Sequence, residues 1–357
     1  MDIIKFHGGD IYNHKGLELI DFSSNINPLG VPESFKNALY KELDEFTKYP
    51  DIKYITLRKN IGEYLKIDNI DFIIPGNGAV DIIYRAIEAT SCSKVISLSP
   101  TFSEYSNAAY KAKIPYEEVC AFYNDYENVN LEEMLNNVVE NTLVVICNPN
   151  NPTGTLISRE KMNFLIKELE KRKSMLIIDE AFMEFTLKSE ENSMIPLIEK
   201  YNNLIIVRAA TKFFGMPGIR LGYGITANKN LINKMWDSME PWSINTAAVI
   251  AGNTVFKDEE YIVRSKKWIE EERSYLYKKL TRLNGIKVYK SSSNFHLIKI
   301  LKEGINAYSL KENLIKSKIL IRVPKGFNNL SEFNFRLAVK DRTSNDILLD
   351  ALKRELV

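Results

Sequence analysis

Short, continuous apolar runs that alternate with amphipathic stretches constrain the fold of this chain more than any other feature of its sequence. The runs are FIIP (72–75), VISLSP (95–100), LVVICNP (143–149), MLIIDEA (175–181) and LIIVRAATK (204–212). Strands that are apolar on both faces and separated by crossover helices are typical of a mostly parallel sheet covered on each side. The pattern therefore predicts an α/β fold with a three-layer α/β/α domain.

The composition along the chain predicts three segments. Residues 1–32 are rich in Gly, Asn and Pro, and we expect an extended arm that belongs with a small domain. Residues 33–245 carry the apolar runs and are expected to form the large domain. A long amphipathic stretch, 244–283, then leads into a smaller α+β domain, which we assign to residues 246–357.

The charge balance and the cysteine usage exclude several classes of partner. The 357 residues include 48 basic and 46 acidic side chains, which leaves a net charge of +2 and no electrostatic basis for a nucleic-acid or membrane partner. No apolar run approaches the ~18 residues of a membrane span, and the amino terminus lacks the apolar core of a signal peptide. Three scattered cysteines without a CxxC pair indicate a reducing cytoplasm, and three scattered histidines predict no metal site.

The first apolar run ends in GNGA (76–79), directly before a helix-like stretch. Ligands of open α/β sheets bind beyond the carboxyl ends of the strands, and free N–H groups at a helix N-terminus bind phosphate. The same residues also fit a plain strand-to-helix turn, so both interpretations stay open. A dinucleotide fingerprint is excluded, because Asp81 stands where the third glycine is required and the later stretch reads SLSP.

Four polar residues at the ends of later runs favour one kind of chemistry. Asp179 follows four apolar residues, so its carboxylate needs a partner: an arginine, a helix N-terminus or a protonated pyridine nitrogen. Lys212 lies between LIIVRAAT and FFGMPG, a setting that can desolvate an amine and make it nucleophilic. Arg220, in GMPGIRLGYG, can clamp a phosphate, and Asn151, in NPNNPTG, can turn its amide toward a ligand. Together with the GNGA turn, these are the parts that a pyridoxal 5′-phosphate (PLP) site needs.

These motifs closely resemble those of the fold type I PLP enzymes of the aspartate aminotransferase superfamily. The resemblance covers nearly the whole chain, through GNGA, PTF, NPNNPTG, DEAF, TKFFGMPGIRLGYG and FRLAV. It implies PLP as the cofactor, held as an imine on Lys212, with Asp179 as the partner of the ring nitrogen. It also implies a homodimer in which Tyr49 of one subunit reaches across the interface and contacts the cofactor phosphate of the other. The other cofactor contacts that it implies are Phe102 on the ring face, Asn151 on the ring hydroxyl, and Gly78, Ala79, Val80, Thr211 and Arg220 around the phosphate.

The chain resembles two neighbouring branches of this superfamily, the threonine-phosphate decarboxylases and the histidinol-phosphate aminotransferases. HGGD (7–10), DFSSNINPLG (21–30), Phe182 and PWSIN (241–245) look more like the first branch. We therefore expect decarboxylation of L-threonine O-3-phosphate to aminopropanol phosphate, which would serve cobalamin biosynthesis. Histidinol-phosphate aminotransferase of histidine biosynthesis, a broad-specificity aminotransferase and a non-catalytic PLP-binding module stay open as alternatives. The resemblance implies that the small substrate is bound by His7, Asn27, Arg322 and Arg336.

Two residues depart from the superfamily pattern. Phe182 stands where aminotransferases usually carry a tyrosine that donates to the ring hydroxyl, so Asn151 is expected to act there alone. Ala209 stands where a serine or threonine is expected, and the lost hydrogen bond to the cofactor phosphate costs about 1 kcal/mol. A role without any substrate contact also stays open for two of the expected substrate-binding residues. Arg322 could instead be an ion-pair partner at a strand edge, and His7 could instead be a solvated side chain.

Overall fold

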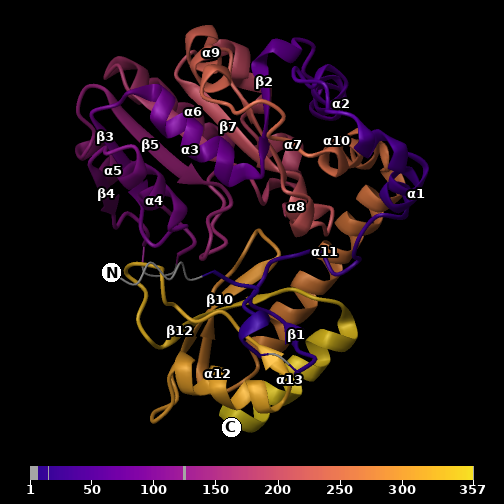
Figure 1. The fold of residues 1–357 in the computed structure, drawn as a ribbon. Helices are drawn as coiled ribbons and strands as arrows, with labels where there is room; N and C mark the ends of the chain where they lie inside the picture. The colour runs from indigo at the N-terminus through magenta and orange to yellow at the C-terminus, as the bar shows by residue number, and fades with distance from the viewer. Residues whose placement is uncertain (1–6, 15, 124–125, 357) are drawn as a thin grey trace.

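The computed structural model describes residues 7–14, 16–123 and 126–356. Figure 1 shows an upper body built around a sheet and a smaller lower body, with the long helix α11 (Glu259–Leu280) running between them. We refer to these two bodies as the large domain and the small domain. The functional pocket described below lies where they meet.

A seven-stranded sheet, in the order β2-β8-β7-β6-β5-β3-β4, forms the centre of the large domain. β8 is antiparallel to both of its neighbours, and the other strands share one direction. The predicted, mostly parallel sheet is thereby confirmed. The strands are β2 (Ile73–Asn77), β3 (Lys94–Leu98), β4 (Tyr116–Val119), β5 (Thr142–Cys147), β6 (Met175–Asp179), β7 (Leu204–Ala209) and β8 (Leu221–Ile225).

The central strands are apolar throughout because each of their faces enters a different hydrophobic core. In β5, Leu143 and Val145 belong to one core, and Val144 and Ile146 belong to the other. Helices close both cores, which confirms the predicted three layers. The first core is covered by α3 (Ala79–Thr90), α4 (Glu104–Lys111) and α9 (Lys229–Asp237), and the second by α2 (Ile55–Leu65), α5 (Leu131–Asn136), α6 (Arg159–Lys171) and α10 (Thr246–Thr254).

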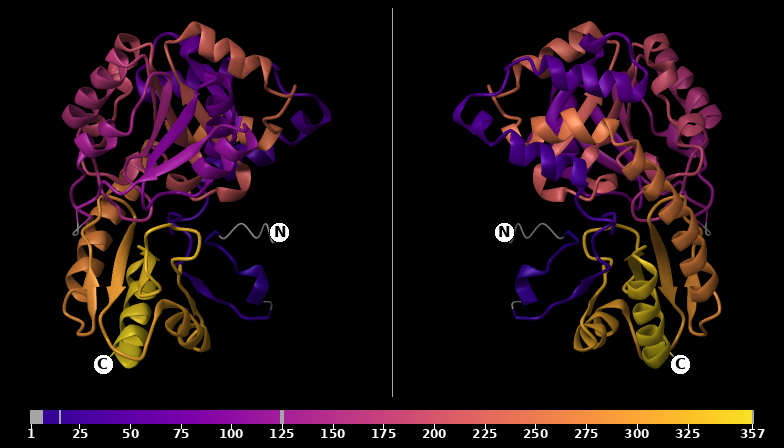
Figure 2. Two further views of the ribbon diagram at one scale, coloured as in Figure 1. Left: turned by 90° about the vertical axis from the view of Figure 1, so that its left-hand side faces the viewer. Right: turned by 90° about the vertical axis from the view of Figure 1, so that its right-hand side faces the viewer.

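The small domain is built on a three-stranded antiparallel sheet in the order β12-β10-β9. The amino-terminal arm runs beside it, because β1 (Ile20–Asp21) pairs in parallel with β11 (Ile319–Leu320). Figure 2 shows the indigo arm alongside the yellow and orange elements of the small domain. The remaining elements there are β9 (Ile286–Val288), β10 (Phe295–Ile300), β12 (Asn334–Ala338), α12 (Ala307–Lys316) and α13 (Arg342–Leu356).

α10 lies with the large domain, although its residues fall within the segment assigned to the small one. It packs against α1 (Glu33–Lys41) and α2. The approach is close, since a Cβ on Gly252 would meet Leu57 Cδ1 at 2.1 Å. The chain therefore passes to the small domain along α11 rather than at residue 246.

The predicted run 204–212 ends earlier as a strand than the sequence suggests. β7 stops at Ala209, and the next residues form the one-turn helix α8 (Ala210–Phe213). Lys212 is therefore held on a helical turn. The shorter helical elements are α7 (Ser189–Asn192) and the 3-10 turns Tyr12–His14, Leu43–Thr47, Ile70–Phe72, Met183–Phe185, Ile195–Lys200, Pro217–Ile219 and Val255–Lys257.

Neither a membrane span nor a metal centre emerges from the described ranges. None of their helices combines the length and the apolar character needed to cross a bilayer. No group of three or more His, Cys, Asp or Glu side chains within them is placed to hold a metal ion.

Candidate active site

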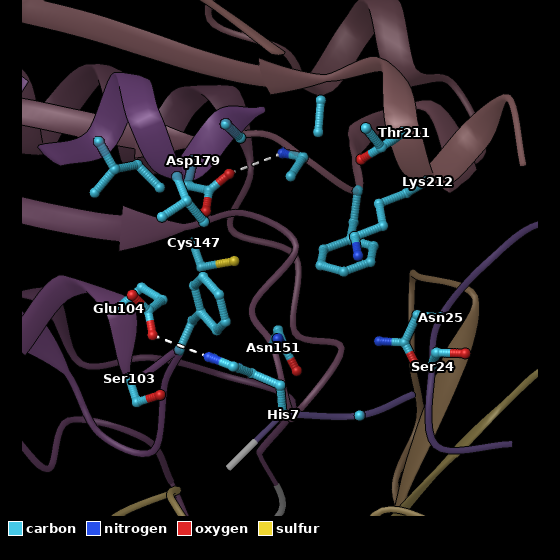
Figure 3. Close-up of a pocket in the computed structure, with 18 of the residues that line it drawn as sticks. His7, Ser24, Asn25, Ser103, Glu104, Cys147, Asn151, Asp179, Thr211 and Lys212 are labelled. Carbon is cyan, nitrogen blue, oxygen red and sulfur yellow. Dashed lines mark hydrogen bonds and ion pairs between the residues drawn. The ribbon is translucent and has the colours of Figure 1, made fainter. Parts of the chain in front are cut away.

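A pocket of about 400 Å³ lies beyond the carboxyl ends of β5, β6 and β7 and is also lined by the arm and the small domain. This is the edge of the sheet at which open α/β folds bind their ligands. Figure 3 shows side chains of the large domain and of the arm around it. Residues predicted for the site that line this pocket are His7, Ala79, Val80, Phe102, Asn151, Asp179, Thr211, Lys212, Arg220, Arg322 and Arg336.

Lys212 reaches the pocket from α8. Burial, together with the nearby positive charges of Arg336 and Arg220, lowers the pKa of its amine to about 8, while Asp179 opposes the shift. A larger share of the amine is therefore neutral near pH 7 than for an ordinary lysine. A neutral, desolvated amine is the form that attacks an aldehyde.

Asp179 ends β6 with its carboxylate buried, at 4 % exposure. Tyr105 Oη donates to Asp179 Oδ2 at 2.7 Å, and the Ala181 amide donates to Oδ1 at 3.0 Å. Burial raises the pKa of Asp179, and these two hydrogen bonds oppose that rise. Each oxygen keeps a further lone pair, so the carboxylate can accept a hydrogen bond from a protonated ring nitrogen.

The amino terminus of α3 and Arg220 form a corner suited to a phosphate. No side chain caps this helix, and Gly78 before it has a φ of +84°. A Cβ on Gly78 would lie 2.3 Å from Arg220 Nη2, so only glycine lets the guanidinium approach. Arg220 Nη2 donates to Asn77 O at 3.2 Å. Gly78 thus shapes this corner without lining the pocket itself.

Arg336 is a buried cation on β12 with unused hydrogen-bonding capacity. Its Nη2 donates to Ser23 O at 2.7 Å, and its Nη1 donates to Asn151 Oδ1. Its Nε has no partner among the described residues. Burial and the nearby charge of Arg322 together lower the pKa of Arg336 to about 9. An arginine buried in this way is suited to binding an anion.

Arg322 lies beside Arg336, because the backbones of the two residues form an antiparallel bridge. Burial lowers the pKa of Arg322 to about 10. Its Nη2 donates to Lys325 O at 2.8 Å, and its guanidinium lies 5.1 Å from the centre of the Phe327 ring. Two guanidinium groups therefore approach the pocket from the small domain.

His7 brings the arm to the large domain. Its Nε2 lies 3.0 Å from Glu104 Oε1, as the dashed line in Figure 3 marks, and its ring lies 5.9 Å from that of Phe102. Burial works to raise the pKa of Glu104, but hydrogen bonds from His7, Tyr84 and Asn107 outweigh it and hold that pKa at about 2. Glu104 is therefore an ionised carboxylate in the pocket wall.

Asn27 does not line the pocket, contrary to the prediction that it binds substrate. Its Nδ2 donates to Phe213 O at 2.8 Å and to Ser265 Oγ at 2.7 Å, so it ties the arm to α8 and α11. Asn25 lines the pocket instead, and its buried Oδ1 has no partner among the described residues. Because 25 and 27 have the same parity in an extended arm, alternation cannot choose between them.

Sequence reasoning missed several other residues of this site. Glu104 and Tyr105 open α4, shortly after the predicted Phe102, and a helical turn would have placed Tyr105 beside Phe102. Cys147, at the end of β5, also lines the pocket, and burial raises the pKa of its thiol. Tyr49 stays outside, 78 % exposed, and its role in a partner subunit remains a prediction.

The pocket residues fit PLP. Lys212 would supply the nucleophile, Asp179 the buried carboxylate, and Arg220 with α3 the corner for an anion. These are the groups that an enzyme using PLP as an electron sink requires. The fold and the site thus define a fold type I PLP-dependent enzyme.

Comparison with known proteins gives the family. Residues 18–352 match the family model of the class I and II aminotransferases, and the chain belongs to that PLP-dependent family. A Caldanaerobacter subterraneus protein that carries the provisional name threonine-phosphate decarboxylase is 40 % identical, over 97 % of this chain and 93 % of its own. The histidinol-phosphate aminotransferase of Methanosphaera stadtmanae is 32 % identical, over 94 % and 90 %. The crystal structure of the histidinol-phosphate aminotransferase of Clostridium acetobutylicum is 38 % identical, with a TM-score of 0.88 over 94 % of this chain and 99 % of that one.

The pKa of Lys212 predicts how the apoenzyme takes up PLP. We expect the rate of uptake to rise with pH and to level off near pH 8, because only the neutral amine attacks the aldehyde. Below that value the rate should fall about tenfold for each pH unit. Stopped-flow absorbance after mixing apoenzyme with PLP between pH 6 and 10 measures this rate. A rate that keeps rising to pH 10 would show that the amine is not desolvated.

Proposed function

We propose that this enzyme decarboxylates a small phosphorylated amino acid, with L-threonine O-3-phosphate as the substrate and aminopropanol phosphate as the product. The observation that carries the proposal is the pair of buried arginines, Arg322 and Arg336, whose backbones form a bridge and whose side chains line one pocket. Two such cations suit a substrate with two anionic groups, a carboxylate and a phosphate. The 40 % identical relative with the provisional decarboxylase name supports the same choice.

The cofactor and its partners define the roles of the protein groups. When bound, PLP supplies an aldehyde for amines and a ring that accepts the electron pair of a bond broken at the substrate Cα. Asp179 keeps a proton on the ring nitrogen, which makes the ring a better acceptor. Lys212, whose amine would hold PLP, would also supply a proton to Cα after the loss of carbon dioxide.

The contact between Arg336 and Asn151 links substrate binding to the cofactor. Arg336 Nη1 donates to Asn151 Oδ1, which leaves the Asn151 Nδ2 as a donor for the ring hydroxyl. Phe182 lines the pocket and cannot donate a hydrogen bond, so the Asn151 amide is the only one of the two that can donate to the ring hydroxyl. The arginine that holds the substrate carboxylate thereby also orients the amide that holds the ring.

Substrate orientation decides which bond breaks. With PLP bound, the bond to Cα that stood perpendicular to the ring would be the one whose electrons the ring could accept. With Arg336 on the carboxylate, and Arg322 and His7 on the phosphate, both ends of the substrate are fixed. We propose that this clamping turns the carboxylate, rather than the hydrogen, out of the ring plane.

Histidinol-phosphate aminotransferase is the second candidate function. The structural relative from Clostridium acetobutylicum carries that name, at 38 % identity. Its amine substrate has a phosphate and no carboxylate, but the keto acid co-substrate of a transamination would also need an arginine. The two functions therefore share a basic pocket and differ in the need for that co-substrate.

A comparison of three substrates tests the proposal. We expect release of carbon dioxide from L-threonine O-3-phosphate without any keto acid, and at least about 100-fold lower kcat/KM with free L-threonine, because the phosphate forms charge-assisted hydrogen bonds. Histidinol phosphate with 2-oxoglutarate is the third arm. Turnover that strictly requires 2-oxoglutarate would overturn the decarboxylase proposal in favour of the aminotransferase.

We also propose that the enzyme works as a homodimer in the cytoplasm. Tyr49 stacks on Trp242 with ring centroids 4.4 Å apart, and both rings are exposed, at 78 % and 44 %. Because this aromatic pair is exposed and lies outside the pocket of its own subunit, Tyr49 is available to contact the cofactor phosphate of a partner subunit. The free thiols of the three cysteines suit a reducing compartment.

A further inference from the structure

Tyr105 touches two predicted cofactor contacts and has no role in the mechanism above. It is fully buried on α4, and its hydroxyl donates to Asp179 Oδ2 at 2.7 Å. Its ring meets the Phe102 ring edge-on, with centroids 5.8 Å apart and an interplanar angle of 86°. One side chain thus supports both the carboxylate and the aromatic ring that flank the predicted position of the cofactor.

We propose that Tyr105 is a positioning residue that keeps Asp179 ionised and aimed at the cofactor ring nitrogen, an inference that rests on the proposed role of Asp179. The hydroxyl must act as a donor for this purpose, because an ionised carboxylate only accepts hydrogen bonds. Burial raises the pKa of Tyr105 well above its ordinary value, so its proton is retained. The direction of the hydrogen bond is therefore fixed.

The surroundings of Asp179 explain why such a donor is needed. Burial raises the pKa of this carboxyl, and the charge of Glu180 raises it further. Tyr105 supplies the first of the opposing interactions, followed by the Ala181 amide and the charge of Lys212. With the cofactor bound, Lys212 would no longer be a free ammonium group near Asp179. The hydroxyl and the amide then remain to stabilise the ionised form and to fix the rotation of the carboxylate.

Replacement of Tyr105 by phenylalanine isolates this effect, because it keeps the ring against Phe102 and removes only the hydroxyl. A carboxylate that loses a donor becomes more basic. In the holoenzyme the proton shared with the ring nitrogen should then move toward Asp179. The ring becomes less cationic and a poorer electron acceptor.

The test is nitrogen-15 NMR of holoenzyme reconstituted with PLP labelled at the ring nitrogen, recorded without substrate. We expect a pyridinium shift in the wild type, a neutral-pyridine shift in Asp179→Asn, and a shift between them in Tyr105→Phe. We expect kcat of Tyr105→Phe to fall about 10- to 100-fold, the equivalent of one charge-assisted hydrogen bond. Substitution of 4-aminophenylalanine at position 105, which restores a weaker donor, should bring the shift most of the way back to the wild-type value.

The control is Tyr201→Phe, which removes the hydroxyl of another buried tyrosine; this hydroxyl donates to Asn163 Oδ1 at 2.6 Å, outside the pocket. It should leave the ring-nitrogen shift unchanged. A wild-type shift in Tyr105→Phe, together with a moved shift in Asp179→Asn, would overturn the role of Tyr105 alone. An unmoved shift in Asp179→Asn would instead overturn the proposed role of Asp179. If Tyr105→Phe does not fold, the 4-aminophenylalanine variant decides, since its weaker donor should move the shift slightly in the same direction if the proposal holds.

Discussion

Lys212→Ala is expected to abolish turnover, by about 10⁴-fold or more, because in the proposed mechanism one side chain both binds the cofactor covalently and moves a proton at Cα. The purified variant should lose the visible absorption that a lysine-bound cofactor gives. Borohydride treatment followed by mass spectrometry of peptides should find the reduced cofactor on Lys212 in the wild type. In the variant no lysine should carry it.

Lys161→Ala is the matched control for this experiment. Lys161 is exposed on α6 and is absent from the pocket lining. Its replacement should change neither the absorption nor the rate. Reduction of the cofactor onto a lysine other than Lys212 in the wild type would refute the assignment of the nucleophile.

Arg336→Gln is expected to lower kcat/KM by roughly 10³-fold, mainly through KM for any substrate that carries a carboxylate. The change removes a buried charge that offers a fork of donors, and hydrogen bonds to charged groups contribute about 1.5–3 kcal/mol each. It also frees Asn151 Oδ1, so the orientation of the amide is lost. The kcat/KM of Arg336→Lys should lie between those of Arg336→Gln and the wild type, because lysine keeps the charge but lacks the planar fork of donors.

Stability must be separated from binding in this second experiment. Arg273, also buried, donates to the carbonyls of Phe185 and Ser292 outside the pocket. Arg273→Gln should therefore lower Tm with little effect on KM. If both variants lower Tm equally and KM stays constant in both, Arg336 has a structural role only.

The sequence carried enough information for the sheet and for most of the pocket. Apolar runs such as 143–149 could belong only to strands covered on both faces, and the polar residues at their ends then had to meet at one edge. β4 and β8 were not predicted. β4 is an edge strand with two glutamates in its four residues, and β8 contains two glycines, so neither has the apolar, β-branched pattern of a buried strand.

The remaining errors concern orientation rather than identity. Asn25 and Asn27 lie in the same polar segment, and only the packing of the arm on α8 and α11 decides which one faces the pocket. Tyr105 carries no sequence mark of its role, because its partner Asp179 lies 74 positions away in the chain. Contacts of this kind arise from the stacking of α4 on the sheet and cannot be derived from local spacing.

The division of labour between the two domains has a consequence for how reactions diversify in such a scaffold. Lys212 and Asp179 belong to the large domain, whereas Arg322 and Arg336 belong to the small domain at the far end of α11. A small change in the bend or length of that helix would therefore tilt a substrate against the cofactor plane without altering any residue that touches either. Mutations in α11 could then change which bond is broken, while Lys212 and Asp179 stay unchanged.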